Sequence, residues 1–167
     1  MPNKKLIFFT EIIASIIITS VAFAQTDDFI KATAKRSAKE IEAAIESQAK
    51  IFKQKKTSAH EKIERDMELS AQYRTTPYDR EIFVSRHSAE IKQSQAVVDG
   101  ALDKELQDNV KMILDRNEYS FRGKYADASG QDKQNVSILY ETILDQLTED
   151  GYMTKEEATK RKIYWKS

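Results

Sequence analysis

The chain has 167 residues with 27 basic and 27 acidic side chains, and charged residues make up 32% of it. Because the formal net charge is zero, no global field attracts the chain to nucleic acid or to anionic lipid. Only four glycines and two prolines are present, and strands need turns that are rich in such residues, so the composition predicts an all-α protein. The absence of cysteine excludes disulfides and lipid attachment through a cysteine.

Residues 1–24 have the features of a secretory signal peptide. Lysines at positions 4 and 5 form a positive start, and an apolar run occupies residues 12–24. The run ends in Ala22-Phe23-Ala24, the small-x-small pattern that signal peptidase cleaves, and polar residues follow at once. We therefore expect cleavage after Ala24 and a periplasmic or secreted protein.

The alternative is that residues 6–24 remain attached as a membrane anchor. A spanning helix needs about 20 apolar residues, and this stretch approaches that length only by including Thr10 and Glu11. A carboxylate inside the membrane costs about 2.5–3.5 kcal/mol on insertion scales, less near the interface. Cleavage is therefore favoured, and membrane contact is expected only if the segment is retained.

Residues 28–74 predict one long amphipathic helix, because they contain no glycine or proline. Asp27 or Asp28 is a suitable N-cap. Apolar or small residues recur with a mean step of about 3.7, a helical period that favours a nearly straight helix over a tight coiled coil. This first stripe comprises Ile30, Ala34, Ala38, Ile41, Ile45, Ala49, Phe52, Ala59, Ile63 and Met67, with Lys56 as the one gap. The stripe is rich in alanine and buries little area per residue, so the helix needs a partner.

Thr75-Thr76-Pro77 marks a break, because proline disfavours helix before it and suits the first turn after it. A second stripe follows with a step near 3.6 residues. Its members are Val84, His87 or Ser88, Ile91, Gln95, Val98, Leu102, Leu106, Val110 and Ile113. Gly100 lies inside this helix and is a candidate kink. The short link predicts that the two helices fold back antiparallel, as a long helical hairpin over residues 25–116.

Residues 117–131 are the longest irregular candidate, since they contain two glycines, two serines and three aromatic residues. We expect a loop here. Its aromatic side chains, Tyr119, Phe121 and Tyr125, either cap the end of the bundle or face a partner.

Residues 132–167 predict a small C-terminal helical hairpin that packs on the bundle. The first of its helices spans about residues 132–148 and ends at Gly151, which suits a left-handed position after a helix. Thr154 and Glu157 have capping-box spacing, which begins a short helix to about Trp165. Tyr164 and Trp165 next to a basic tail are either a partner-binding surface or a lid that closes the bundle.

The stretch from Leu144 to Ala158, followed by Lys160-Arg161-Lys162, resembles the short C-terminal helical-hairpin domain of bacterial proteins. That family pairs a leucine-bearing helix, an Asp-Gly-x-Ile-Thr-x-Glu-Glu turn and a basic second helix. The likeness covers roughly the last 30 residues, and it departs from the family at Ala158 and Ile163, where the family has Phe and Leu. The resemblance implies an oligomerisation or tethering module. In general style, the whole chain is similar to periplasmic accessory or minor-pilus components of conjugation-type secretion machines.

No residue pattern in the chain indicates catalysis, a cofactor or a metal. His60-Glu61-Lys62-Ile63-Glu64 lacks the second histidine of a zinc protease helix, and the only other histidine is His87. Nucleophile elbows, phosphate loops and the Glu-x-x-His pairs of di-iron bundles are also absent. We therefore predict a protein that is not an enzyme, with no catalytic, cofactor-binding or metal-binding residues.

The main hypothesis is an exported helical protein that binds other envelope proteins or itself, with no nucleic acid partner. It predicts partner-binding roles for Tyr119, Phe121, Tyr125, Tyr164 and Trp165. One alternative is a periplasmic chaperone or stress protein that holds unfolded clients on the apolar side of the hairpin. Another alternative is a cell-wall hydrolase or an inhibitor of one, which only the expected compartment supports.

Overall fold

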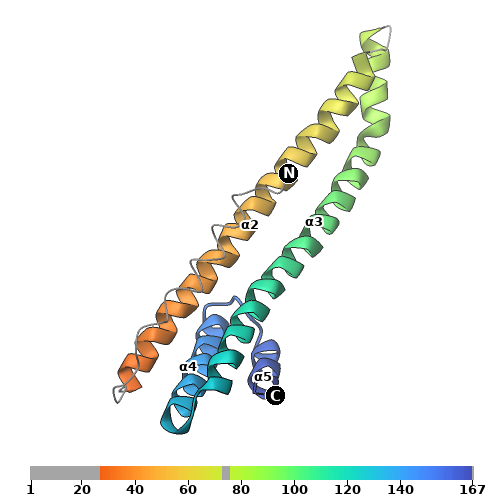
Figure 1. Ribbon diagram of the computed structural model, residues 1–167. Helices are drawn as coiled ribbons and strands as arrows, with labels where there is room; N and C mark the ends of the chain where they lie inside the picture. The colour runs from red at the N-terminus through yellow and green to blue at the C-terminus, as the bar shows by residue number, and fades with distance from the viewer. Residues whose placement is uncertain (1–26, 73–75, 167) are drawn as a thin grey trace, which may run out of the picture. The chain divides into compact units, whose positions relative to one another are not determined.

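The structure is a computed structural model that describes residues 27–72 and 76–166 (Figure 1). These residues form helices α2 (Asp27–Gln72), α3 (Pro77–Asp127), α4 (Gly130–Glu149) and α5 (Lys155–Tyr164), with no strand among them. The all-α prediction is confirmed. The predicted signal segment and most of the link before Pro77 lie outside the described residues.

The chain forms two compact units. The first unit joins residues up to Ala43 with residues from Arg116 onward, and the second unit comprises Ala44–Asp115. Both long helices therefore contribute to each unit. This division differs from the expected boundary after residue 116, because the N-terminal part of α2 belongs with the C-terminal helices.

Local capping sets the start of α3. The Thr76 hydroxyl accepts a hydrogen bond from the Asp79 backbone N–H at 3.1 Å and donates one to the Asp79 carboxylate at 2.6 Å. Pro77 occupies the first helical position, where its missing N–H costs nothing. Asp79 also lies in the first turn, where a carboxylate complements the helix dipole.

The turn between α4 and α5 has the predicted glycine and cap. Gly151 has φ 81°, and the backbone N–H groups of Gly151 and Tyr152 donate to the carbonyl oxygens of Thr148 and Leu147. These two bonds are those of a Schellman motif. Thr154 caps α5 by accepting from the Glu157 N–H at 3.2 Å. The Glu157 carboxylate accepts from Arg161 Nε at 2.8 Å, a contact that the capping box does not predict.

The predicted loop over residues 117–131 is wrong, because α3 continues to Asp127. Only Ala128 and Ser129 separate α3 from α4, and Gly130, with φ 55°, turns the chain. Gly123 does not end the helix. A helical glycine costs only about 1 kcal/mol, and the neighbouring side chains of Phe121 and Arg122 contact Tyr140 and the Tyr164 backbone oxygen. Gly100 does not interrupt α3 either.

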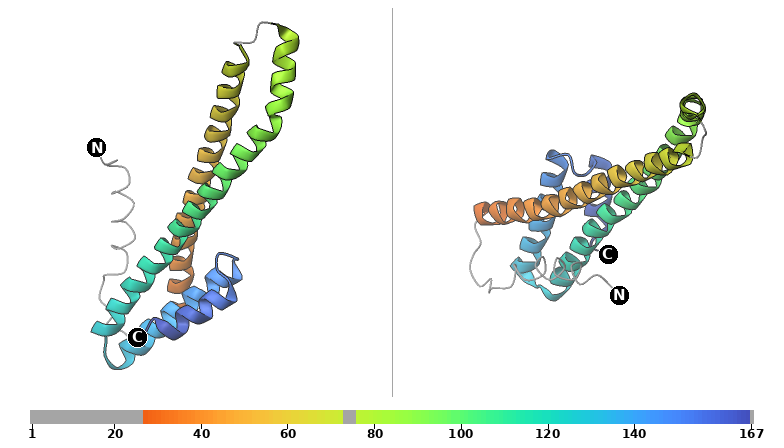
Figure 2. Two further views of the ribbon diagram at one scale, coloured as in Figure 1. Left: turned by 90° about the vertical axis from the view of Figure 1, so that its right-hand side faces the viewer. Right: turned by 90° about the horizontal axis from the view of Figure 1, so that it is seen from above.

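The first unit has a well-buried core. In Figure 2, α4 and α5 lie side by side, and both views show them close together. The first stripe supplies the α2 side of this core with Ile30, Ala34, Ala38 and Ile41. The other helices and the C-terminal residues supply Phe121, Tyr140, Ile143, Leu144, Leu147, Met153, Ala158 and Trp165.

The second unit is a two-helix hairpin, as the short link predicts. Polar pairs join its helices, with Lys56 Nζ 2.7 Å from Asp103 Oδ1 and Gln95 Nε2 3.1 Å from Glu64 Oε1. Between these two contacts, His60 Nε2 lies 2.9 Å from Asp99 Oδ1. Residues advance by four along α2 as they retreat by four along α3, so the helices are antiparallel in a single register.

Candidate interaction surfaces

The structure separates the five predicted partner-binding residues into two groups. Tyr119 and Tyr164 are 80% and 62% exposed, whereas Phe121 and Trp165 are 3% and 0% exposed. Tyr125 is half-buried. For Phe121 and Trp165, the structure supports the alternative in which the aromatic side chains close the bundle.

The buried aromatic residues form one cluster around Tyr140, a residue that the sequence analysis did not single out. The Tyr140 ring centroid lies 5.0 Å from that of Phe121 and 4.8 Å from that of Trp165. Tyr125 packs edge-on against Trp165 at 5.0 Å. Tilted and edge-on pairs at these distances are the favoured aromatic geometry. The cluster therefore joins α3 and α4 to the C-terminal end of the chain.

A buried ion network lies next to this cluster. Arg161 Nη1 is 3.0 Å from Glu118 Oε2, and the Arg161 side chain is only 7% exposed. The Tyr140 hydroxyl is 3.4 Å from the same Glu118 oxygen. Burial, and then the Glu118 carboxylate, raise the pKa of Tyr140 well above its usual range, so the phenol stays protonated and can donate. The contact between Glu118 and Arg161 fixes α5 against α3.

The exposed tyrosines lie beside this network. Arg122 donates from Nη2 to Glu118 Oε1 at 2.8 Å and to the Tyr164 backbone oxygen at 3.0 Å. Tyr119 lies one turn before Arg122 on α3, so both residues belong to one face of that helix. Lys160 lies one turn before Tyr164 on α5.

A second polar link joins α2 to the turn after α4. Lys39 Nζ lies 2.6 Å from Glu42 Oε2 and 3.2 Å from Asp150 Oδ2. The hydrogen bond from the Gln146 amide, then contacts with Glu42 and Lys39, lower the pKa of Asp150. Glu42 is 4% exposed, and its Oε1 atom has no hydrogen-bond partner among the described residues. This link ties the N-terminal part of α2 to the C-terminal hairpin.

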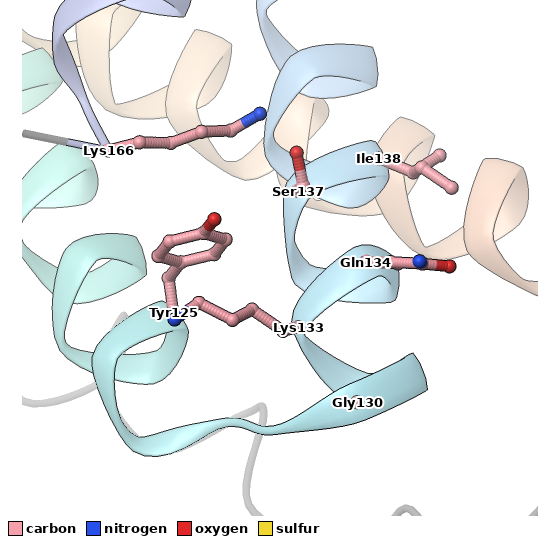
Figure 3. A pocket seen from close by; sticks show the side chains of 7 residues that line it. All are labelled: Tyr125, Gly130, Lys133, Gln134, Ser137, Ile138 and Lys166. Atoms are coloured by element: carbon pink, nitrogen blue, oxygen red, sulfur yellow. The ribbon is translucent and has the colours of Figure 1, made fainter.

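A groove in the first unit lies between the end of α3, α4 and the chain's C-terminal end (Figure 3). Its volume is about 490 Å³, and Figure 3 shows Tyr125 between the side chains of Lys133 and Lys166. Both ammonium groups already have partners, since Lys166 is 2.8 Å from Glu141 and Lys133 lies 4.5 Å above the Tyr125 ring. The groove therefore has no free charged group aimed into it.

The hairpin of the second unit leaves its apolar stripe half covered. In α2, Ile45 and Phe52 are buried, whereas Ala59, Ile63 and Met67 are only half-buried. The stripe on α3 is also only half-buried, at His87, Ile91, Gln95, Val98, Leu102, Leu106, Val110 and Ile113. The side chain of Val84 lies outside the described part of the chain, and Ala49 is exposed. Two helices cannot enclose a stripe from all sides, so this hairpin leaves apolar side chains partly exposed over much of its length.

The two histidines make ordinary helical contacts. His60 pairs with Asp99 across the hairpin, and His87 Nδ1 lies 2.7 Å from the Phe83 backbone oxygen. No group of three or more His, Asp or Glu side chains in the described segments is arranged to hold a metal ion.

The residues that the sequence analysis missed are Glu118, Arg122, Tyr140 and Arg161. A signal for part of this network was present, since Glu118–Arg122 and Glu157–Arg161 both have the four-residue spacing of helical ion pairs. Nothing in the sequence indicates that Glu118 also binds Arg161, because that contact depends on how the helices pack.

None of the helices in the described residues has a segment long and apolar enough to span a membrane. Comparison of the chain with protein-family models, with curated proteins and with solved structures gives no match.

Proposed function

We propose that this protein is exported and acts through protein–protein contacts in the cell envelope, without catalysis, as an accessory component of a secretion or conjugation machine. The observation that carries the proposal is the half-covered stripe of the second unit. A helix pair that exposes apolar side chains along its length favours association with further helices. The signal-like residues 1–24 support the compartment.

The test is a crosslinked pull-down from the native envelope with a C-terminally tagged chain, read by mass spectrometry. We expect a small, defined set of machine subunits. The variant Ile63→Asp/Met67→Asp places charges on the half-covered stripe and should lose these partners. The matched control Ser58→Asp/Ser70→Asp places the same charges at exposed positions of the same helix and should retain them.

Three outcomes would contradict parts of the proposal. Equal capture by both double variants removes the stripe as the binding surface. Capture of many unrelated proteins, with suppression of client aggregation in vitro, favours the chaperone alternative, which the same exposed stripe supports. An intact mass that includes residues 1–24 rejects cleavage after Ala24.

A further inference from the structure

In the second unit, polar side chains make most of the direct contacts between α2 and α3. Four pairs define this polar contact line: Gln48–Asn109, Lys56–Asp103, His60–Asp99 and Glu64–Gln95. The residues one position before members of the line include four apolar residues, which are only half-buried: Ala59, Ile63, Val98 and Leu102. The apolar residues of this part of the hairpin therefore lie beside the contact line, not on it.

These four apolar residues lie on one side of the hairpin. Successive residues of an α-helix are about 100° apart, so each of the four side chains is turned away from the contact line. Because α2 and α3 are antiparallel, one step back on each helix turns toward the same side. The opposite side consists of the residues one position after the line, which are exposed and mostly polar: Thr57, Glu61, Arg65, Ala96, Gly100 and Lys104.

The apolar side also has charged residues, at one end only. Lys55 and Asp108 likewise come one position before the line, and Lys55 Nζ lies 3.0 Å from Glu105 Oε1. These three residues lie farther than the apolar ones from the hairpin tip, where α2 ends and α3 begins (Figure 1). We call the four apolar and these three charged residues the open face. Its charge is basic on α2 and acidic on α3.

We infer that the open face is covered by the open face of a second copy of this chain, in a two-fold dimer whose hairpin tips point the same way. This inference rests on the proposed function and names the partner that covers the half-covered stripe. A two-fold axis parallel to the helices puts α2 of each copy against α3 of the other at the same height.

The open face is complementary to itself in this arrangement. Its apolar half meets the apolar half of the other copy, and each Lys55 lies between its own Glu105 and the Glu105 of the other copy. With the tips pointing in opposite directions, the apolar half of one copy would meet the charged half of the other. Such burial of charges against apolar side chains is costly.

The size of the half-covered stripe also suits a second copy. From Ile91 to Val110 it extends about 30 Å along α3, and two helices side by side are about 20 Å wide, so two copies would bury about 1,200 Å² in total. This area is at the low end for specific interfaces. We therefore expect a dimer of moderate affinity.

The first test is sedimentation equilibrium of the purified chain at about 1–100 µM. The unmodified chain should be a dimer at the upper end of this range. Ile63→Asp should raise the dissociation constant at least about tenfold, since a carboxylate replaces an apolar contact in both copies. Thr57→Asp is the matched control, because it adds the same charge to α2 on the opposite, exposed side and should leave the dimer intact.

The second test exchanges the charges of the open face. Lys55→Glu alone places four carboxylates together in the dimer, and Glu105→Lys alone places four ammonium groups together, so each variant should dimerise about tenfold more weakly. An equimolar mixture of the two variants restores opposite charges between the copies and should recover the loss. Circular dichroism should show equal helix content, since both side chains are about half exposed.

Three results would overturn the inference. An unmodified chain that stays monomeric at about 100 µM has no such dimer. Equal weakening by Thr57→Asp would show that the open face is not the interface. A mixture of the charge variants that is no tighter than either variant alone would rule out an arrangement with tips pointing the same way.

The envelope pull-down separates failure of this inference from failure of the proposed function. If the chain is monomeric but Ile63→Asp/Met67→Asp still loses the captured partners, the proposed function stands and another subunit covers the stripe directly. If the chain is a dimer but captures no defined partner, the inference stands and the proposed function fails.

Discussion

The two units of this protein differ in how completely they bury the apolar stripe of α2. In the first unit, the end of α3, α4 and α5 share a core with the alanine-rich part of α2, and side chains such as Leu147 and Tyr140 are fully buried. In the second unit, α2 and α3 are the only helices among the described residues; Ile45 and Phe52 are buried there, but most stripe residues are only half-buried. The α2 stripe is thus buried from Ile30 to Ile41 in the first unit and only half-buried at Ala59, Ile63 and Met67 in the second. The binding role proposed above for the second unit rests on that partial burial.

The largest expected difference between the units is the cost of truncating a leucine. Leu147→Ala removes a side chain that is 0% exposed and should lower the free energy of unfolding by about 2–5 kcal/mol. Leu106→Ala makes the same change at a half-buried position and should cost about 1 kcal/mol. Urea unfolding checks both, with Trp165 fluorescence for the first unit and circular dichroism for all helices. Equal costs would mean that Leu106 is covered in solution, for example by a second copy.

The next largest difference is expected between the stability costs of breaking one ion pair in each unit. Arg161→Met leaves the Glu118 carboxylate without its most buried partner and should destabilise the first unit by about 3 kcal/mol. Lys56→Met breaks the contact with Asp103 on the exposed hairpin and should cost less than about 1 kcal/mol. The double variant Arg161→Met/Glu118→Leu should recover part of the loss, because no buried charge is then left alone. A double variant as unstable as the single one would assign the loss to packing.

Replacing each of two glycines by alanine should change the free energy of unfolding by a smaller amount, in opposite directions. Gly100 lies inside α3, and an added Cβ would meet no atom within 4 Å, so Gly100→Ala should raise stability by about 0.5–1 kcal/mol. Gly151 has φ 81°, so Gly151→Ala should lower stability by about 1 kcal/mol despite equal space around it. Thermal unfolding of both variants measures these shifts. A stabilising Gly151→Ala would contradict the left-handed turn after α4.

The smallest expected effect depends on pH. Burial alone would raise the pKa of Glu141, but hydrogen bonds from Lys166 and Ser137 outweigh it and hold the pKa below its ordinary value of 4.5. Stability from this carboxylate is therefore present above about pH 4.5 and is lost as pH falls through the folded-state pKa. Glu141→Gln should cost about 0.5 kcal/mol at pH 7, because the Lys166 pair is partly exposed. The cost should vanish near pH 3, and urea unfolding at both pH values checks it.

Local signals in the sequence predicted the helix boundaries well. Pro77, Gly151 and Thr154 each act on a backbone group within a few residues, and the structure places all three as expected. The prediction failed at residues 117–131, where two glycines and several aromatic residues suggested a loop. There the cost of helical Gly123 is outweighed by burial of Phe121 and by the contacts of Glu118 and Arg122, which depend on distant helices.

The burial of individual aromatic residues could not be predicted from the sequence. Phe121 and Tyr119 are two positions apart on α3, and Trp165 directly follows Tyr164, yet one member of each pair is buried and the other exposed. Helical periodicity alone separates such neighbours onto different faces, but it does not say which face meets the core. That choice depends on where α4 and α5 pack.

By itself, the sequence determined that the chain is helical, where most helices begin and end, and which stripe on each long helix is apolar. These features depend on backbone geometry and on contacts within a few turns. Only the tertiary structure decided which part of the stripe becomes a core, which tyrosines stay exposed, and that Arg161 reaches Glu118. These outcomes require segments far apart in the chain to meet, and the free energy of that packing is a property of the assembled helices.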